Sequence, residues 1–394
     1  MKANDFLQLI AIMIFSTGCS SNKQSKDCLP YIDLSRNYPE KNIILTDIAD
    51  VSYVHLTNKE CDDYLYKGTI RYITENIIVI ADESAGSILF FSKDGNPKSR
   101  FNHYGSGPEE YPCKGRDIPS FVYDETGNDV FISYFNIILV YSSMGEYKRK
   151  IILPPSTRMS LVDFDDQSLF VYDGQKQFDK FIKKTAFPHQ SIDSSFFRIS
   201  KTDGKILDYV IIPNNEKDLT DCGGGRVLRN FGNMRRCAAG LLLSNPETDT
   251  VFLYMNDKSI APVFCKKPLV DNVYPKAILS NFMDVGRYQF MTVETLFNLE
   301  DIGKFPYKYY IHDKQTGEIF RQKVVLSDYK GKELFISAKN TLFNGKETLA
   351  YFELDLFELK QAYRENKLNG KLKELVATLN EYEDNNVFML VNFN

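Results

Sequence analysis

Tryptophan is absent from this sequence, and histidine is rare. The four histidines, His55, His103, His189 and His312, are scattered, with no His-x-His or His-x-x-x-His pair. Hydrolytic metal centres usually draw their ligands from such clusters. We therefore expect no metal site and no cofactor, and we expect each histidine to be an isolated surface or strand residue.

Closely spaced cysteines are also missing. The chain has seven cysteines but no Cys-x-x-Cys pair, which excludes zinc-ribbon and thioredoxin-like sites. Apart from Cys19, the spacing allows either disulfides or buried free thiols for the other six, which are Cys28, Cys61, Cys113, Cys222, Cys237 and Cys265.

The chain has no excess of positive charge and no recognisable catalytic motif. Its formal net charge of −4 argues against nucleic acid as a partner. The glycines 223–225 lack the Lys-Ser/Thr of a phosphate loop. Asp163, Asp165 and Asp166 lack the glycine and distal glutamate of a calcium loop, so we expect them in a solvated turn.

The first residues form a targeting segment. Leu7 to Phe15 is apolar but too short to span a bilayer. The small residues Ser16-Thr17-Gly18 before Cys19 resemble a bacterial lipobox, which predicts a signal peptide over 1–18 and a lipid on Cys19. The alternative is an ordinary signal peptide with a chance cysteine. Residues 19–30 are mostly polar and suit a flexible tether.

The rest of the chain reads as a β-meander that recurs. Ile77 to Asp82 and Ser87 to Ser92 read as strands, and a Lys93–Asn96 turn leads to a third strand. Similar units follow at 129–153, 168–212, 240–265, 288–325 and from about 334 to 354. Radial repetition of such sheets predicts an all-β fold, a β-propeller over 31–394, and the irregular spacing of the units leaves the number of blades open. A β-sandwich would not explain the repeated strand order.

The end of the chain departs from the meander. Residues of about 356–383 have apolar side chains at helical spacing, which predicts a C-terminal helical insertion. Residues 387–393 form a last strand with apolar side chains on both faces, so we expect burial between layers. Its expected neighbours are early strands such as 51–56, in a blade that closes the ring.

A short motif follows the first meander. Gly105, Gly107, Pro108, Glu110 and Tyr111 match the Gly-Arg-Gly-Pro-Gly-Glu-Tyr motif of a known family, with Ser106 and Glu109 replacing an arginine and a glycine. With this motif, the mature chain resembles the six-bladed β-propeller lipoproteins of Bacteroidetes, whose function is largely unassigned. In such lipoproteins early acidic residues accompany surface export, so the late first acid, Asp27, favours the periplasmic side of the outer membrane.

The motif also has a physical interpretation. Glycines adopt backbone conformations barred to other residues, and proline fixes φ, so the motif predicts a stiff connection between blades. Tyr111 can pack its ring and hydrogen-bond its hydroxyl group. The functional alternative is that Glu110 and Tyr111 line the central channel.

An arginine-rich segment stands out in this acidic chain. Between Cys222 and Cys237 it contains Arg226, Arg229, Arg235 and Arg236. Guanidinium groups bind carboxylates, phosphates and sulfates well, which predicts an anionic-ligand surface if the four converge. The alternative is a solvated loop whose arginines pair with local acids.

Two function classes remain. The first is a non-catalytic, monomeric cell-envelope lipoprotein that binds a glycan, a peptide or an envelope protein and contacts the membrane through its lipid anchor. The second is a propeller enzyme such as a glycan lyase or hydrolase, with residues converging from several blades. The lack of clustered histidines favours the first. Tyrosine, histidine, arginine and carboxylate groups converging in a deep cleft would favour the second.

Overall fold

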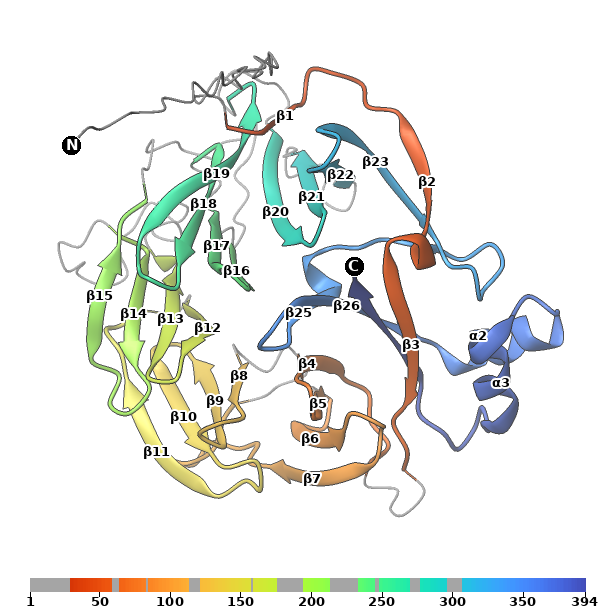
Figure 1. Ribbon diagram of the computed structural model, residues 1–394. Helices are drawn as coiled ribbons and strands as arrows, with labels where there is room; N and C mark the ends of the chain where they lie inside the picture. The colour runs from red at the N-terminus through yellow and green to blue at the C-terminus, as the bar shows by residue number, and fades with distance from the viewer. Residues whose placement is uncertain are drawn as a thin grey trace, which may run out of the picture.

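The chain folds into a ring of six sheets around a central axis (Figure 1). The computed structural model describes residues 29–394 apart from 59–63, 83, 113–120, 157–158, 176–193, 213–232, 245–247, 270–276 and 296–306. Each sheet is one blade, numbered here in the chain order of the innermost strands. The fold is therefore an all-β, six-bladed β-propeller, which confirms the propeller predicted from the repeated meander and the six blades implied by the family resemblance.

Blades 1 to 3 are four-stranded meanders in chain order, with the first strand nearest the axis. Blade 1 consists of β4 (Thr69–Ile73), β5 (Ile77–Asp82), β6 (Ser87–Ser92) and β7 (Pro97–Asn102). Blade 2 consists of β8 (Phe121–Asp124), β9 (Asp129–Tyr134), β10 (Ile137–Tyr141) and β11 (Tyr147–Ile152). Blade 3 consists of β12 (Met159–Asp165), β13 (Ser168–Asp173), β14 (Phe196–Ser200) and β15 (Ile206–Val210).

Blades 4 to 6 each include a strand from the start of the chain. Blade 4 contains β16 (Asn233–Cys237), β17 (Gly240–Ser244), β18 (Thr250–Met255), β19 (Ile260–Lys267) and β1 (Tyr31–Asp33). Blade 5 contains β20 (Ala277–Val285), β21 (Tyr288–Thr295), β22 (Tyr307–Asp313), β23 (Glu318–Val325), β24 (Glu333–Leu334) and β2 (Glu40–Ile44). Blade 6 contains β25 (Thr341–Phe343), β26 (Thr348–Leu354), β27 (Val387–Phe393) and β3 (Ala49–His55).

The middle strands of the blades are buried on both faces. In β5, Ile78 and Ile80 belong to the apolar cluster between blades 1 and 6, whereas Val79 and Ala81 belong to the cluster between blades 1 and 2. Alternate side chains of one strand therefore fill two different interfaces. This explains why such strands are continuous apolar runs in the sequence, without the polar alternation of a half-exposed sheet.

The last strand closes the ring. β27 pairs with β26 on one side and antiparallel with β3 on the other, where Val387 lies opposite His55 and Phe393 opposite Ala49. One face of β27 joins the cluster of blades 5 and 6, and the other face, with Phe388 and Leu390, packs towards blade 1. The pairing confirms the prediction that the final strand joins an early strand and is buried on both faces.

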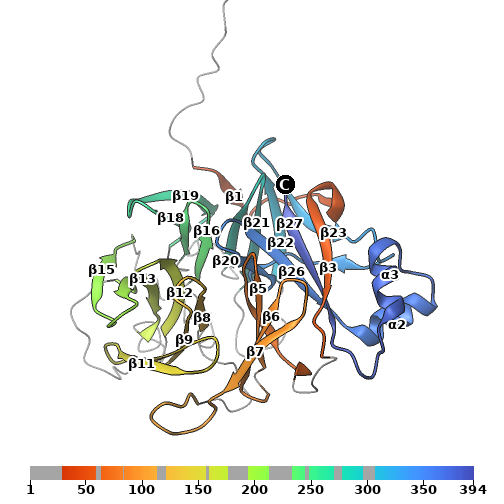
Figure 2. The same ribbon diagram turned by 60° about the horizontal axis from the view of Figure 1, so that its bottom comes forward.

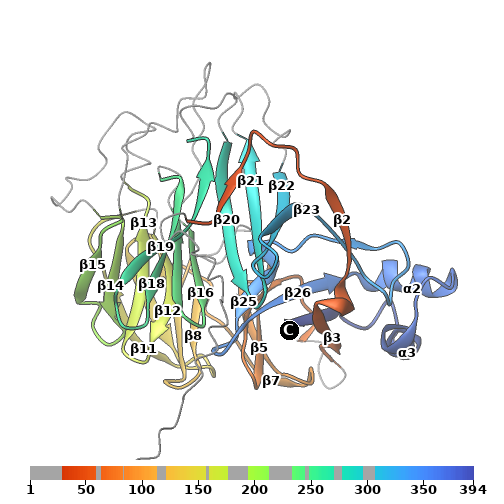
Figure 3. The ribbon, with the colours of Figure 1, turned by 45° about the horizontal axis from the view of Figure 1, so that its top comes forward.

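The first described residues lie along the outer rim of three successive blades (Figure 3). β1 pairs parallel with β19 of blade 4, β2 pairs parallel with β23 of blade 5, and β3 then completes blade 6. An outer strand otherwise leaves a row of backbone groups unpaired. We call β1 and β2 the rim strands; they cover two such edges and tie the blades together.

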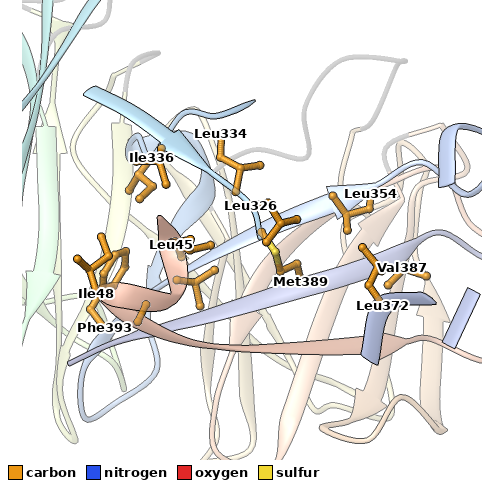
Figure 4. Packing of buried hydrophobic residues seen from close by; sticks show 14 of the residues in the cluster. Leu45, Ile48, Leu326, Leu334, Ile336, Leu354, Leu372, Val387, Met389 and Phe393 are labelled. Atoms are coloured by element: carbon orange, nitrogen blue, oxygen red, sulfur yellow. The ribbon is translucent and has the colours of Figure 1, made fainter. Parts of the chain in front are cut away.

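Two helices are inserted between β26 and β27, outside the ring (Figure 2). Asp355 caps α2 (Leu356–Arg364) by accepting the N–H of Glu358 at 2.9 Å. Leu372 and Val376 of α3 (Gly370–Thr378) are fully buried. With the short 3-10 helix Leu45–Asp47 they complete one cluster over blades 5 and 6 (Figure 4).

Two details differ from the sequence prediction. The sixth unit does not begin near Leu334, because Leu334 pairs with Val324 of β23 and so belongs to blade 5. A short 3-10 helix, Ala338–Asn340, separates it from the first strand of blade 6. The helical insertion is shorter than expected, because α3 ends at Thr378 and turns with hydrogen bonds around Asn380 precede β27.

Deleting residues 387–394 should unfold the whole domain rather than fray its end. The deletion removes the partner of both β26 and β3 and leaves blade 6 as two separate pieces. Differential scanning calorimetry of the truncated and full-length soluble proteins tests this. We expect a melting temperature many degrees lower or no cooperative transition.

A matched pair of substitutions provides the control. Phe388 in β27 is 0 % exposed, whereas Phe357 in α2 is 53 % exposed. Phe388→Ala should lower the free energy of unfolding by about 3–5 kcal/mol, and Phe357→Ala should change it far less. A truncated protein that melts within about a degree of the parent would contradict the closure role.

Candidate functional site

A cavity of about 660 Å³ lies on the propeller axis. All six inner strands contribute to its wall, mostly through their carboxyl-terminal residues and the turns that follow them. Exposed turn residues such as Asp166, Asn256 and Gly345 mark where it reaches solvent. Since the inner strands run side by side around the axis (Figure 1), residues distant in sequence meet in this cavity.

Lys201 neutralises two carboxylates of the wall. It lies in the turn between β14 and β15, and its Nζ is 2.7 Å from Asp124 Oδ2 and 2.9 Å from Asp163 Oδ1. Only 7 % of the lysine side chain is exposed. Two carboxylates at such a site need a nearby cation, because burial penalises charge. Lys201 therefore links the inner strands of blades 2 and 3.

Lys201, Asp124 and Asp163 form a charged triad in which burial and charge act against each other on the pKa values. Burial raises the pKa of Asp163, and the charge of Lys201 offsets this only in part. Burial alone would lower the pKa of Lys201, but the carboxylates of Asp163 and Asp124 outweigh it and raise that pKa. The lysine is therefore held as an ammonium ion at neutral pH, and it gives up its proton only at strongly alkaline pH.

Arg236 of β16 is held in one position within the cavity wall. Its guanidinium lies over the rings of Phe164 and Phe343, at 5.2 and 5.5 Å from their centroids. One of its terminal nitrogens donates to Asn256 Oδ1 at 3.0 Å. Cation–π contacts of this kind orient a guanidinium without neutralising it. Burial lowers the pKa of Arg236, and Asp163 partly restores it.

Two neighbouring side chains add hydrogen-bond donors to the wall. Burial lowers the pKa of Arg235 to about 10, so this arginine is still charged at neutral pH. Burial raises the pKa of Tyr72 well above its usual value, so its phenol keeps its proton. The wall thus offers fixed cations and a protonated hydroxyl group, which suit a ligand rich in hydrogen-bond acceptors.

The structure places two of the four predicted arginines in this cavity. Arg235 and Arg236 are consecutive residues of β16 and both line it. Arg226 and Arg229 lie outside the described residues. The pair in β16 belongs to an inner strand rather than a solvated loop, and whether all four bind anions stays a prediction.

The glycine motif lies elsewhere, between blades 1 and 2. Glu110 Oε2 accepts the N–H of Gly107 at 2.7 Å, and a Cβ built on Gly105 would lie 1.9 Å from the same oxygen. A side chain at Gly105 would therefore displace the carboxylate that holds the turn. Pro108 stands inside this turn, between Gly107 and Glu110.

Tyr111 anchors the motif to blade 1. Its ring is fully buried, and its hydroxyl donates to the carbonyl oxygen of Gly86 at 2.7 Å and accepts the N–H of His103 at 3.2 Å. Neither Glu110 nor Tyr111 is part of the cavity wall. These contacts are those of a structural connection between blades.

The described histidines and cysteines do not form a reactive cluster. His103 stacks on Tyr141 with ring centroids 5.0 Å apart, and burial lowers the pKa of His312. Cys237 is a buried free thiol whose pKa is raised by burial. Within the described ranges, no three His, Cys, Asp or Glu side chains are placed to hold a metal ion. His189, Cys28, Cys61, Cys113 and Cys222 lie outside those ranges.

Sequence reasoning missed most of the cavity wall. Asp163 was expected in a solvated turn, but it lies in β12 and faces Lys201. That expectation was wrong because the other two members of the triad lie far away in the sequence: Lys201 comes from a later turn of the same blade and Asp124 from blade 2. The places of the wall residues in the sequence could have indicated the cavity wall. Tyr72, Asp163 and Arg236 all lie near the ends of strands that precede a turn.

Comparison with known proteins identifies the family. Residues 20–224, more than half of the 394, match the family model DUF5128, described as a 6-bladed beta-propeller. The chain belongs to this family. No curated protein matches the sequence. No helix among the described residues of this family member is long and apolar enough to cross a membrane.

Solved structures share the fold at low identity. A Bacteroides fragilis protein, named for its expected export, is 17 % identical, with 93 % of this chain and 100 % of that one covered and a TM-score of 0.59. A DUF4221 member from Bacteroides vulgatus is 11 % identical, with 88 % and 97 % covered and a TM-score of 0.48. A virginiamycin B lyase from Staphylococcus aureus is 10 % identical, with 70 % and 88 % covered and a TM-score of 0.38. These likenesses concern the fold alone.

Replacing Lys201 by methionine should destabilise the propeller at neutral pH. Lys201→Met keeps an unbranched side chain one atom shorter but leaves Asp124 and Asp163 without their shared cation. We expect the free energy of unfolding to fall by about 3–5 kcal/mol, as measured by urea denaturation.

The control is a lysine in an exposed ion pair. Lys332 lies 3.1 Å from Glu358, and both side chains are largely accessible, at 35 % and 60 % exposure. Lys332→Met should cost less than about 1 kcal/mol. Equal effects of the two substitutions would show that the triad contributes no special stability.

Proposed function

We propose that this protein is an exported, lipid-anchored propeller of the cell envelope that binds a ligand in its axial cavity without transforming it. The supporting observation is the cavity of about 660 Å³, within the ~300–1,000 Å³ typical of small-molecule sites. Its wall combines aromatic rings such as those of Phe164 and Phe343 with many charged and amide side chains, which suits a polar ligand.

The fixed polar groups favour binding over catalysis. A general base works best with a pKa near the operating pH. Tyr72 stays protonated because burial raises its pKa, and Asp163 is held by Lys201. No histidine is among the described residues of the wall. The described wall therefore contains fixed donors for recognition, and it has no histidine to serve as a general base.

The enzyme alternative has one observation in its favour. Tyrosine, arginine and carboxylate side chains do converge on one cavity, as Tyr72, Arg236 and Asp163 show. A glycan lyase or hydrolase could use such groups. We therefore treat turnover as an outcome of the binding experiment rather than as a separate proposal.

The proposed location rests on the start of the chain. The apolar run 7–15 followed by Ser16-Thr17-Gly18-Cys19 suits export and lipid attachment at Cys19. The Bacteroides fragilis protein of similar fold is named for expected export, which agrees with this. We propose an anchor in the outer membrane, on the periplasmic side, with a monomeric propeller and a glycan, peptide or envelope protein as its partner.

The binding proposal predicts saturable binding without product. A panel of neutral and acidic sugars and short peptides is screened by thermal shift, and each hit is incubated with the protein and followed by mass spectrometry. We expect at least one compound to raise the melting temperature in a saturable way and to be recovered unchanged. Steady conversion of a hit would establish the enzyme alternative, and a panel without hits would refute small-ligand binding.

The anchor proposal predicts a change of location. Cys19→Ser removes the only thiol at the expected processing site. We expect the variant to appear in the soluble fraction, while Cys28→Ser, the matched control, stays with the membranes. A Cys19→Ser protein that remains membrane-bound like the parent would rule out lipidation at this residue.

A further inference from the structure

The carboxylates on the inner strands around the cavity each lie within ion-pair distance of a cation. Asp124 and Asp163 share Lys201 at 2.7 and 2.9 Å. Asp165 lies 3.4 Å from Arg198, and Asp284 lies 2.6 Å from Lys314. Each of these cations comes from outside the inner strands, and Lys201 and Arg198 each contact two carboxylates.

Arg236 differs from these acids because it has no carboxylate partner among the described residues. Its contacts are two aromatic rings and the amide oxygen of Asn256. A guanidinium has five N–H donors in a rigid fork, and only one N–H is engaged in a hydrogen bond to a described residue. The net effect is a pre-oriented positive group on a wall whose inner-strand carboxylates each lie beside another cation.

We propose that Arg236 is the anion-binding group of the axial cavity, and that the ligand is a small organic acid carrying hydroxyl groups. The proposal rests on the proposed function and specifies its ligand. The ligand's carboxylate would replace water on the free edge of the guanidinium, which suits bidentate carboxylate binding. Phe164 and Phe343 hold the fork in place, so little side-chain entropy is lost on binding.

The other polar groups of the wall indicate that the ligand carries hydroxyl groups. Asp163 keeps 32 % of its side chain exposed while bound to Lys201, so its carboxylate can accept hydrogen bonds from a ligand. Asn256 holds Arg236 with its oxygen and donates its amide to Ala238, which fixes the turn beside the site. An acid with no hydroxyl groups would leave Asp163 facing the ligand without a donor.

The experiment uses the soluble domain and calorimetric titration with five probes. The probes are glucuronate, its neutral methyl ester, glucose, inorganic phosphate and sulfate. We expect saturable binding of glucuronate, with the ester and glucose weaker by about tenfold or more, since a hydrogen bond to a charged group is lost. Phosphate and sulfate should bind more weakly than glucuronate but compete with it.

The variant is Arg236→Gln, and the matched control is Arg364→Gln. Arg364 lies on α2 with 61 % of its side chain exposed, in an ion pair with Glu381. Arg236→Gln should weaken glucuronate at least about tenfold, and Arg364→Gln should leave binding unchanged. Because Arg236 packs between rings, the melting curve of each variant is recorded first. If Arg236→Gln does not fold, the difference in affinity between glucuronate and its ester on the parent protein tests whether the cavity binds a carboxylate.

Different failures have different meanings. Equal binding of the ester and glucuronate, or no effect of Arg236→Gln in a folded protein, overturns the anion site but leaves ligand binding in the cavity standing. Phosphate bound as tightly as glucuronate overturns the requirement for hydroxyl groups. No binding of any of the five probes overturns this inference, and a panel of wider chemistry then tests the proposed function separately.

Discussion

The antiparallel pairing of β27 with β3 is the contact on which the rest of this structure depends. A propeller blade cannot bury its faces alone, so each blade is stable only between two neighbours. The β27–β3 ladder runs from Val387 opposite His55 to Phe393 opposite Ala49 and makes blade 6 a complete neighbour of blades 5 and 1. With the ring complete, six inner strands surround one axis and bring side chains from different blades together. The axial cavity is thus a product of closure.

The fold could be predicted because its signals are local. The meanders of blades 1 to 5 each show their apolar runs and turns within one continuous stretch of sequence. β27 is apolar on both faces because it is buried between two interfaces. The rim strands could not be predicted in the same way. The burial pattern of β2 is exposed or intermediate throughout, so nothing in its side chains indicates a strand. Its place is set by backbone hydrogen bonds to β23, far along the chain.

The site was predictable only in part, for a related reason. Arg235 and Arg236 stood out because arginines cluster in an acidic chain. The partners that define their surroundings do not cluster: Lys201 reaches Asp124 across 77 residues of sequence. A single aspartate such as Asp163 shows no sign in the sequence that a lysine from a later turn will cover it. Charge pairing across blades is a property of the ring, and it becomes visible only when the blades are placed side by side.

The rim strands also determine how the molecule bears a mechanical load. A pull on the chain before residue 29 is transmitted first to β1, whose three residues pair with Cys265, Lys266 and Lys267. The load next reaches the five-residue β2 and only then the seven-residue β3 that closes the ring. Detachment therefore proceeds from the shortest ladder to the longest. β1 and then β2 can therefore detach from their blades and lengthen the free chain, while the ring and its cavity stay intact.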